Sequence, residues 1–407
     1  MAAISRLLAV VLLLACVCCY ATPTDNTLLQ DRNDAPALDS LIGEGANQEA
    51  LAQRTFFYNG GSYVYNETIG GTISVGKQYV EKLTPSCGVK QKHPIVFFHG
   101  GGDTGVQWLN KPDGGQGWAS YFLKKGYEVY IVDIWSVGRS ADSALSPLRT
   151  SATTESSERA FSAPEKFPYY YQARFHTQWP GNGSKGDPIF DAFYATLLPL
   201  TISTIQQTYS QSATCALLRT IGHPSILITH SAGGSVAFLA TDACPDLVAG
   251  HVALEADQTP FTNFDNGTFG AREGLPTRPY GISLIPLNYS PPIKSPDDLK
   301  RQVVGTLEET EGRISKYPCI QQDVTKTVHT LPNVAKAPVL FLTTEASIHA
   351  LYDQCLVAYL RQAGVEVEFV RLEDRGIRGN GHFMMLEKNS DVIAGLADEW
   401  IGGLEGK

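Results

Sequence analysis

The strongest indication of chemistry in this sequence is a serine placed between small residues. Residues 226–238 read ILITHSAGGSVAF, an apolar run of strand length followed by Ser231 and a helix-like segment. A serine hydroxyl is a weak nucleophile unless a base removes its proton, and a sharp strand-to-helix turn exposes it for that purpose. Such turns favour Gly-x-Ser-x-Gly; Gly233 fits this pattern and Thr229 departs from it. We predict that Ser231 is a nucleophile, the alternative being a serine that caps the helix.

A glycine run earlier in the chain supplies a second part of the same chemistry. The stretch FFHGGGDTG at 97–105 follows another predicted strand. Glycines let backbone N–H groups approach a bound oxygen closely. In enzymes whose nucleophilic serine lies on a turn of this kind, one of the two N–H groups that stabilise the oxyanion comes from this loop. The other donor comes from the residue after the serine, so Gly101 (or Gly102) and Ala232 are the predicted pair. A plain turn is the alternative, and a phosphate loop is disfavoured because GK[ST] is missing.

The general base and its acid come from the second half of the chain. His382, in RGIRGNGHFMMLEK, follows the last predicted strand and precedes the final predicted helix. That is where the base belongs when the chain order is Ser, acid, His. Glu255 ends the predicted strand of HVALEADQTP, next to the nucleophile strand, and is the preferred acid. Glu345, which ends the following strand, and Asp257 remain alternatives.

These residues must be positioned by strands and helices that alternate along the chain. Continuous apolar runs of strand length occur at 94–100, 126–133, 225–231, 248–255, 337–345 and 365–374. Helix-period segments lie between or after them, at 118–125, 232–243, 349–363 and 391–402. Residues 55–83 alternate like strands and are broken by glycine pairs. The sequence therefore predicts an α/β fold with a mostly parallel central sheet covered by helices on both faces.

Two long segments, 139–200 and 257–335, interrupt this alternation. Loops of this length are uncommon in compact domains unless they cover a site. We predict that both form a cap over the carboxyl ends of the strands, where open α/β sheets bind ligands, with peripheral decoration as the alternative. Aromatic residues that could line a substrate pocket, although each could equally belong to the core or the cap, are Trp108, Trp135 and Tyr170.

The first residues have the features of a secretory signal peptide. One Arg precedes an apolar run from Leu7 to Tyr20, and small residues surround a predicted cleavage point near Ala21. The run is too short to span a bilayer comfortably, which argues against a membrane anchor. We predict a signal peptide at 1–21, a flexible or processed leader at 22–54, and one domain with the two cap insertions at 55–405.

Glycosylation and cysteine patterns agree with secretion. Four Asn-x-Ser/Thr sequons predict glycosylation at Asn66, Asn182, Asn266 and Asn288. Beyond the signal peptide the cysteines are Cys87, Cys215, Cys244, Cys319 and Cys355. Two disulfides and one free thiol would fit these five cysteines, although the sequence cannot fix the pairing. The first hypothesis is Cys319–Cys355, because it would tie the end of the second insertion to the core.

Composition excludes several classes of partner. The chain has 32 Lys and Arg against 41 Asp and Glu, a net charge of -9, which disfavours nucleic acid or an anionic membrane surface. No Cys-x-x-Cys motif follows the signal peptide, and His349 and Asp353, at helical spacing, lack a third ligand, so no metal is predicted. The chemistry outlined above requires no organic cofactor.

Taken together, the motifs THSAGG, HGGG and GNGH resemble the α/β-hydrolase superfamily over residues 72–405. The segment HGGGDTGVQWLNKPDGGQGWASYFLKKGYEVYIVDIWSVGRS is similar to a group of secreted esterases whose triad acid is a glutamate after strand six. The resemblance implies Ser231, Glu255 and His382 as the triad, with oxyanion donors at Gly101 and Ala232. The chain departs from that group where glycines replace a cysteine pair in the oxyanion loop.

The expected protein is a secreted carboxylic-ester hydrolase that works through an acyl-enzyme on a small-molecule ester. One alternative keeps the triad and changes the reaction to lactone opening, acyl transfer or cyclisation. A second alternative is a non-catalytic, ligand-binding relative, which is disfavoured because a binding protein needs no base-activated serine.

Overall fold

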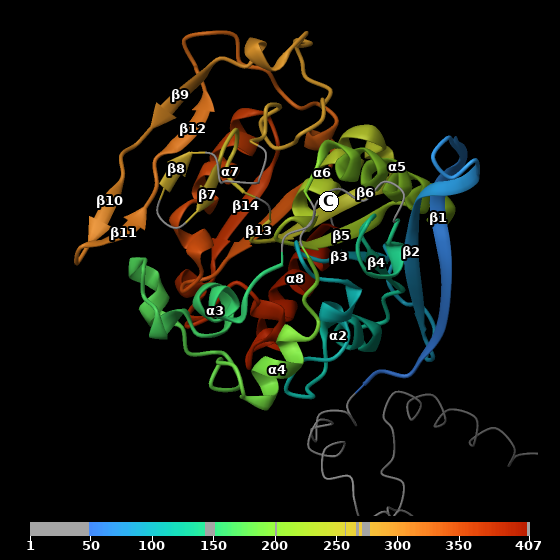
Figure 1. Ribbon diagram of the computed structural model, residues 1–407, viewed down its shortest axis with the longest axis horizontal. Helices are drawn as coiled ribbons and strands as arrows, with labels where there is room; N and C mark the ends of the chain where they lie inside the picture. The colour runs from blue at the N-terminus through green and yellow to red at the C-terminus, as the bar shows by residue number, and fades with distance from the viewer. Residues whose placement is uncertain are drawn as a thin grey trace, which may run out of the picture.

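The computed structural model describes residues 49–142, 151–199, 202–256, 258–265, 268–270 and 277–404. Within these residues the central element is an eight-stranded sheet (Figure 1). Its strands, in spatial order, are β1 (Ala52–Asn66), β2 (Gly71–Pro85), β4 (Val129–Asp133), β3 (Ile95–Phe98), β5 (Ser225–His230), β6 (Val248–Leu254), β13 (Val339–Thr343) and β14 (Val367–Arg371). From β4 to β14 all neighbours pair in parallel, whereas β2 pairs antiparallel with both β1 and β4. The predicted, mostly parallel sheet is confirmed.

Helices cover both faces of this sheet, as its continuous apolar strands require. They are α2 (Trp118–Lys124), α5 (Thr204–Ile221), α6 (Gly233–Ala243), α7 (Asp353–Gln362) and α8 (Ser390–Leu404). On one face Phe97 of β3 packs in a cluster with Phe122 of α2 and Ala397 of α8. On the other face its neighbour Phe98 packs with Leu217 of α5 and Ala237 of α6. Figure 1 shows α5 and α6 together on the side of the sheet opposite α2 and α8.

Helix α5 was not expected from the sequence, and its composition explains why. Its sequence TIQQTYSQSATCALLRTI is rich in Ser, Thr and Gln, and Ser and Thr often favour caps and turns over helix interiors. Its ends are nonetheless well defined, because the Ser203 side chain accepts a hydrogen bond from the N–H of Gln206 and Gly222 ends the helix at φ 84°. Packing of Leu217 and Leu218 against the sheet and α6 supplies the stability that propensity does not.

The two insertions contain short elements. The first has α3 (Thr154–Ser157), a 3₁₀ turn over Tyr171–Phe175 and α4 (Pro188–Tyr194). The second holds three two-stranded sheets, formed by β7 (Asn263–Asp265) with β8 (Thr268–Gly270), β9 (Arg301–Val304) with β12 (Cys319–Gln322), and β10 (Glu308–Thr310) with β11 (Arg313–Lys316). These two-stranded sheets lie outside the main sheet (Figure 1), and Ile314 of β11 also forms a parallel bridge with Tyr170 of the first insertion.

The insertions contact each other and the carboxyl edge of the main sheet. Gln172 Nε2 donates to the carbonyl of Ser315 at 2.7 Å, which joins the first insertion to the second. The Tyr170 hydroxyl donates to the carbonyl of Ala346, just after β13, at 2.8 Å. The N–H of Thr177 donates to the carbonyl of Gly379, after β14, at 2.9 Å. The first insertion therefore packs against the loops that follow β13 and β14, and the second insertion packs against the first.

Two disulfides fix elements of the second half of the chain. Cys215–Cys244 joins α5 to the end of α6. Cys319–Cys355 joins β12 of the second insertion to α7, which confirms the pairing expected from the sequence. None of the helices within the described ranges has the length and apolar character needed to cross a bilayer.

The start of the domain differs from the prediction. β1 begins at Ala52, inside the segment 22–54 that was expected to be a leader, because residues 52–54 pair with β2. The predicted signal peptide at 1–21, and the leader up to residue 48, lie outside the described residues.

Candidate active site

Ser231 occupies a strained turn between β5 and α6. Its φ is +48°, a left-handed conformation that non-glycine residues rarely adopt and that often marks a functional site. The N–H of Ser231 donates to the carbonyl of Leu254, at the end of β6, at 3.1 Å. A Cβ at Gly233 would lie 2.6 Å from the carbonyl oxygen of His99. Only a glycine fits there, which is the physical reason for the second glycine of the motif.

Thr229 stands where the motif favours the first glycine, and the structure accommodates it inside the sheet. Its side chain is fully buried on β5, and its Oγ1 lies 2.7 Å from Nε2 of His251 on β6. Because the hydroxyl has this partner, the threonine carries no unsatisfied polar group at the turn.

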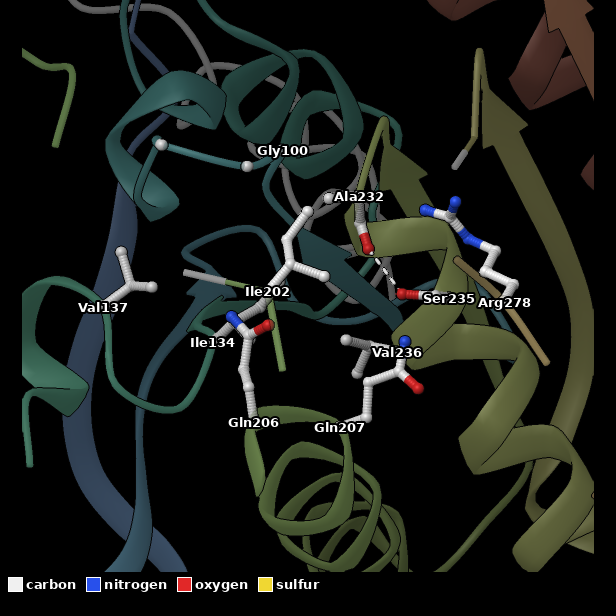
Figure 2. A pocket seen from close by; sticks show the side chains of 12 residues that line it. Gly100, Ile134, Val137, Ile202, Gln206, Gln207, Ala232, Ser235, Val236 and Arg278 are labelled. Carbon is white, nitrogen blue, oxygen red and sulfur yellow. Dashed lines mark hydrogen bonds between the residues drawn. The ribbon is translucent and has the colours of Figure 1, made fainter. Parts of the chain in front are cut away.

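The glycine loop after β3 lies directly against the Ser231 turn. A Cβ at Gly100 would be 2.8 Å from Nδ1 of His230 and 3.3 Å from Cβ of Ser231. The predicted oxyanion residues Gly101 and Ala232 line one common pocket, in which Figure 2 shows Ala232 and Gly100, the neighbour of Gly101. The structure therefore brings together the two backbone segments that sequence reasoning assigned to one function.

The remaining walls of this pocket are mixed in character, and the sequence did not identify them. Ile134, Val137, Ile202 and Val236 are apolar, whereas the polar side chains are Gln206, Gln207, Ser235 and Arg278 (Figure 2). Arg278 is buried, and its Nη1 donates to the carbonyl of Thr262 at 3.3 Å.

The aromatic residues expected to line a pocket lie elsewhere. Trp108 is fully buried in the core and stacks on Phe97 with ring centroids 4.6 Å apart. Trp135 is buried against Tyr209 at 4.9 Å, and Tyr170 is buried in the cap. None of the three predicted residues is among those that line the pocket beside the glycine loop. Large aromatic rings stabilise the core here instead, since burying them removes much apolar surface from water.

Asp103, next to the glycine loop, was also not singled out by the sequence. It is buried, and its Oδ2 has no hydrogen-bond partner among the described residues. Burial raises the pKa of its carboxyl to about 8. An uncharged carboxyl at neutral pH keeps negative charge away from a loop that would bind an oxyanion.

His382 and Glu255 form a short hydrogen bond although they are far apart in the chain. Nδ1 of His382 lies 2.6 Å from Oε2 of Glu255, and both side chains are buried. The loop of His382 is also tied to the serine turn, because Nε2 of His230 donates to the carbonyl of His382 at 3.0 Å. His230 immediately precedes Ser231, so the imidazole and the serine belong to one site.

Glu255 is held in place through its second oxygen and its backbone. Oε1 accepts hydrogen bonds from the N–H of Thr344 at 2.8 Å and from its hydroxyl at 2.6 Å. Glu255 itself has a φ of +43°, a second strained residue at the end of a strand. Thr344, just after β13, was missed by sequence reasoning, since no motif marks a threonine that fixes a carboxylate.

The alternative acid Glu345 forms other hydrogen bonds. Glu345 accepts hydrogen bonds from Nη1 of Arg378 at 2.6 Å and from the N–H of Gly379 at 2.9 Å. It therefore anchors the loop that carries His382. Asp257 lies outside the described residues.

Burial and neighbouring charges shift the pKa of both members of this pair. Burial, followed by the charge of His349, lowers the pKa of His382, while its hydrogen bond to Glu255 acts in the opposite direction. Burial disfavours ionised Glu255, but the hydrogen bond from His382 and the charges of His349 and His382 hold its pKa below the usual value. A neutral imidazole beside a carboxylate is the state that can accept a proton.

The same cluster could be considered as a metal site. Glu255, His349 and His382 offer ligand atoms within 4.8 Å of one another. Both oxygens of Glu255, however, already accept hydrogen bonds from His382 and Thr344, and Nδ1 of His349 is bonded to Asp353 at 2.9 Å. A cation would have to break these bonds, so we interpret the cluster as acid–base machinery.

Comparison with known proteins agrees with the fold. Residues 95–396 match the alpha/beta hydrolase family. Over 365 residues the chain is 39% identical to the "probable secreted lipase phiG" of a fungal species, covering 89% of this chain and 93% of that protein. The solved structure of a novel bacterial esterase has the same fold, with a TM-score of 0.55 at 20% identity over 87% of this chain and 96% of that one. The chain belongs to the alpha/beta hydrolase family, which confirms the resemblance stated above.

Proposed function

We propose that this protein is a secreted serine hydrolase that cleaves carboxylic esters with Ser231 as nucleophile, His382 as general base and Glu255 as its acid. The observation that carries the proposal is the 2.6 Å hydrogen bond between His382 Nδ1 and Glu255 Oε2. It leaves the other ring nitrogen available on a loop bonded to the residue before Ser231. The 39% identical relative is named a probable secreted lipase, which supports the same reaction class.

In the proposed reaction each of these groups has one role. Nε2 of His382 takes the proton of Ser231 as Oγ attacks the ester carbonyl, and Glu255 stabilises the resulting imidazolium. The N–H groups of Gly101 and Ala232 donate to the oxyanion of the tetrahedral intermediate. Collapse expels the alcohol, which receives the proton from His382, and leaves an acyl-enzyme on Ser231. Water then attacks the acyl carbon, with His382 again taking a proton, and the carboxylic acid is released.

Secretion is the second part of the proposal. It is supported by the apolar run at 7–20 and by the described sequons: Asn182 and Asn288 are exposed and Asn66 is half-buried, so a glycosyltransferase could reach the first two readily. Asn266, the fourth predicted glycosylation site, lies outside the described residues. Disulfides of the kind found at Cys319–Cys355 persist in oxidising compartments.

Replacing Ser231 tests the reaction. Ser231→Ala should lower kcat/KM for a short activated ester by about a thousandfold or more, because no hydroxyl remains to form the acyl-enzyme. Ser225→Ala is the control, since Ser225 is a buried serine at the start of β5, at the end opposite the Ser231 turn, and its replacement should leave turnover within a few-fold. Retention of most activity by Ser231→Ala, with unchanged thermal unfolding, would exclude this residue as the nucleophile.

A further inference from the structure

A second acid–histidine pair lies beside His382, and the reaction outlined above gives it no role. Nδ1 of His349 lies 2.9 Å from Oδ1 of Asp353. The other carboxylate oxygen of Asp353 accepts a hydrogen bond from the Thr343 hydroxyl at 2.6 Å. Both His349 and Asp353 are buried. A buried ionisable pair costs desolvation energy, so its position next to a reacting group requires an explanation.

The end of β13 anchors both acid–histidine pairs. The hydroxyl of Thr343 is bonded to Asp353, and the hydroxyl of the next residue, Thr344, is bonded to Glu255. Consecutive strand residues point to opposite faces, and here each fixes one carboxylate. The end of one strand therefore fixes the carboxylate of each pair.

The two imidazole rings are stacked. The ring centroids of His349 and His382 are 4.5 Å apart and their planes differ by 12°. The ring of His230 lies 4.4 Å from His382 at an angle of 44°, and Phe161 lies 5.6 Å away at 25°. A ring enclosed in this way can tilt little without a clash, and His349 supplies the most nearly parallel of these surfaces.

We propose that His349 is a positioning residue for the general base: stacked on His382 and anchored by Asp353, it fixes the plane of the imidazole that accepts the proton. This inference rests on the proposed function, because it takes His382 as the base. It adds a residue that acts through His382 and does not itself touch the ester.

The groups that face His349 determine the sign of the expected pH effect. They are Asp353 and Tyr352 from its own segment, Glu255 after β6, His230 at the end of β5 and His382 after β14. Further out, Tyr170 of the first insertion interacts with Glu255, and Arg278 of the second interacts with Tyr352. Burial raises the pKa of Asp353 to about 6, so this pair changes its proton content under mildly acidic conditions.

Like charges on two stacked rings oppose each other, so the two histidines titrate as a coupled pair. The charge of His349 lowers the pKa of His382. It thereby keeps the base neutral at lower pH than burial and Glu255 alone would allow. Without His349, the acidic limb of the activity profile should therefore move to higher pH.

Two substitutions separate the stacking role from the charge role. In His349→Phe a ring remains but its charge is lost, so the plateau kcat should stay within about threefold while the acidic midpoint of kcat/KM rises by about one pH unit. In His349→Gln the stack is lost as well, and both the plateau and the midpoint should change. Midpoints within about 0.2 pH unit of the unmodified protein in both folded variants would overturn the inference.

A control and a second readout keep this result distinct from failure of the proposed function. His329→Gln removes a buried histidine of the second insertion, bonded to the carbonyl of Pro291, and should leave the pH profile unchanged. The titration of His382 by NMR in a Ser231→Ala background needs no turnover. A higher midpoint for His382 in the double variant Ser231→Ala with His349→Phe than in Ser231→Ala alone supports the inference, even if no ester is hydrolysed. An identical midpoint in the two proteins refutes it.

Discussion

At the scale of single residues, the site depends on which carboxylate meets the imidazole of His382. Glu255 and Glu345 follow neighbouring strands, and both were candidates. Glu255 is bonded to Nδ1 of the ring, whereas Glu345 is bonded to Arg378 and the backbone of Gly379. Glu255 therefore acts on the imidazole ring itself, whereas Glu345 holds the backbone of the loop that carries His382.

This difference predicts unequal effects of two matched substitutions. Glu255→Gln removes the charge that stabilises the imidazolium, and an amide can hold the ring in the wrong tautomer, so kcat/KM should fall by about 10³- to 10⁴-fold. Glu345→Gln should cost less than about tenfold and act mainly on thermal stability. The two variants are compared by measuring kcat/KM for the same activated ester in steady-state kinetics. The reverse order of effects would move the acid to the end of β13.

The sequence predicted Ser231, His382 and Glu255 because each stands at a recognisable position after a strand. It could not predict the stack of His349 on His382, since the spacing of His349 and Asp353 indicates only a shared local segment. Which ring a buried histidine contacts depends on loops from distant parts of the chain. The sequence also could not show whether Trp108 lines a pocket or lies in the core, because composition does not distinguish a core indole from one at a site. The structure places Trp108 in the core.

At the scale of elements, the loop that carries His382 is held by a histidine from the first insertion. Nε2 of His176 lies 2.7 Å from Oε1 of Glu387, and its Nδ1 lies 3.0 Å from Oε2 of Glu165. The carboxylate of Glu387, itself buried, also accepts the N–H of Gly381 at 2.9 Å. The first insertion thus contributes a protonated histidine, which links Glu165 of the same insertion to Glu387 beside the loop that carries His382.

Stability should therefore depend on pH through His176. Burial opposes its charge, but the hydrogen bonds and charges of Glu165 and Glu387 raise its pKa from 6.5 to about 9. A raised pKa means that the folded state binds the proton more tightly, so the stabilisation is complete below about pH 6.5 and is lost as the pH rises through 9. His176→Gln should lower the free energy of unfolding by roughly 3 kcal/mol at pH 6. The difference in free energy of unfolding between His176→Gln and the unmodified protein should shrink towards pH 10. If denaturant titrations give the same difference at every pH, this assignment is contradicted.

Most strands and helices of the core could be predicted, because continuous apolar runs and helical periodicity directly reflect burial on two faces of a sheet. The structure confirms all six predicted core strands and places α2, α6, α7 and α8 on the predicted segments. α5 and the strand pair β9–β12 could not be predicted. The stability of α5 comes from contacts with the sheet, and β9 and β12 are short strands with partly exposed side chains that pair only with each other.

At the scale of the whole molecule, the three proposed triad residues come from loops at one edge of the parallel sheet, and both insertions pack over that edge. The first insertion reaches the loop of His382 through His176. The second is tied to α7 by Cys319–Cys355, close in the chain to His349. The cap and the base therefore form one connected unit, although each insertion interrupts the core fold at a different point.

The central claim is that distant residues converge to activate one hydroxyl, and covalent labelling tests it most directly. A fluorophosphonate should react with the intact protein, and peptide mapping should find the adduct on Ser231, because an activated serine attacks phosphorus as it would an ester carbonyl. In folded His382→Ala the labelling rate should fall by about a hundredfold or more. An adduct on another residue, or equal labelling rates with and without His382, would contradict the account.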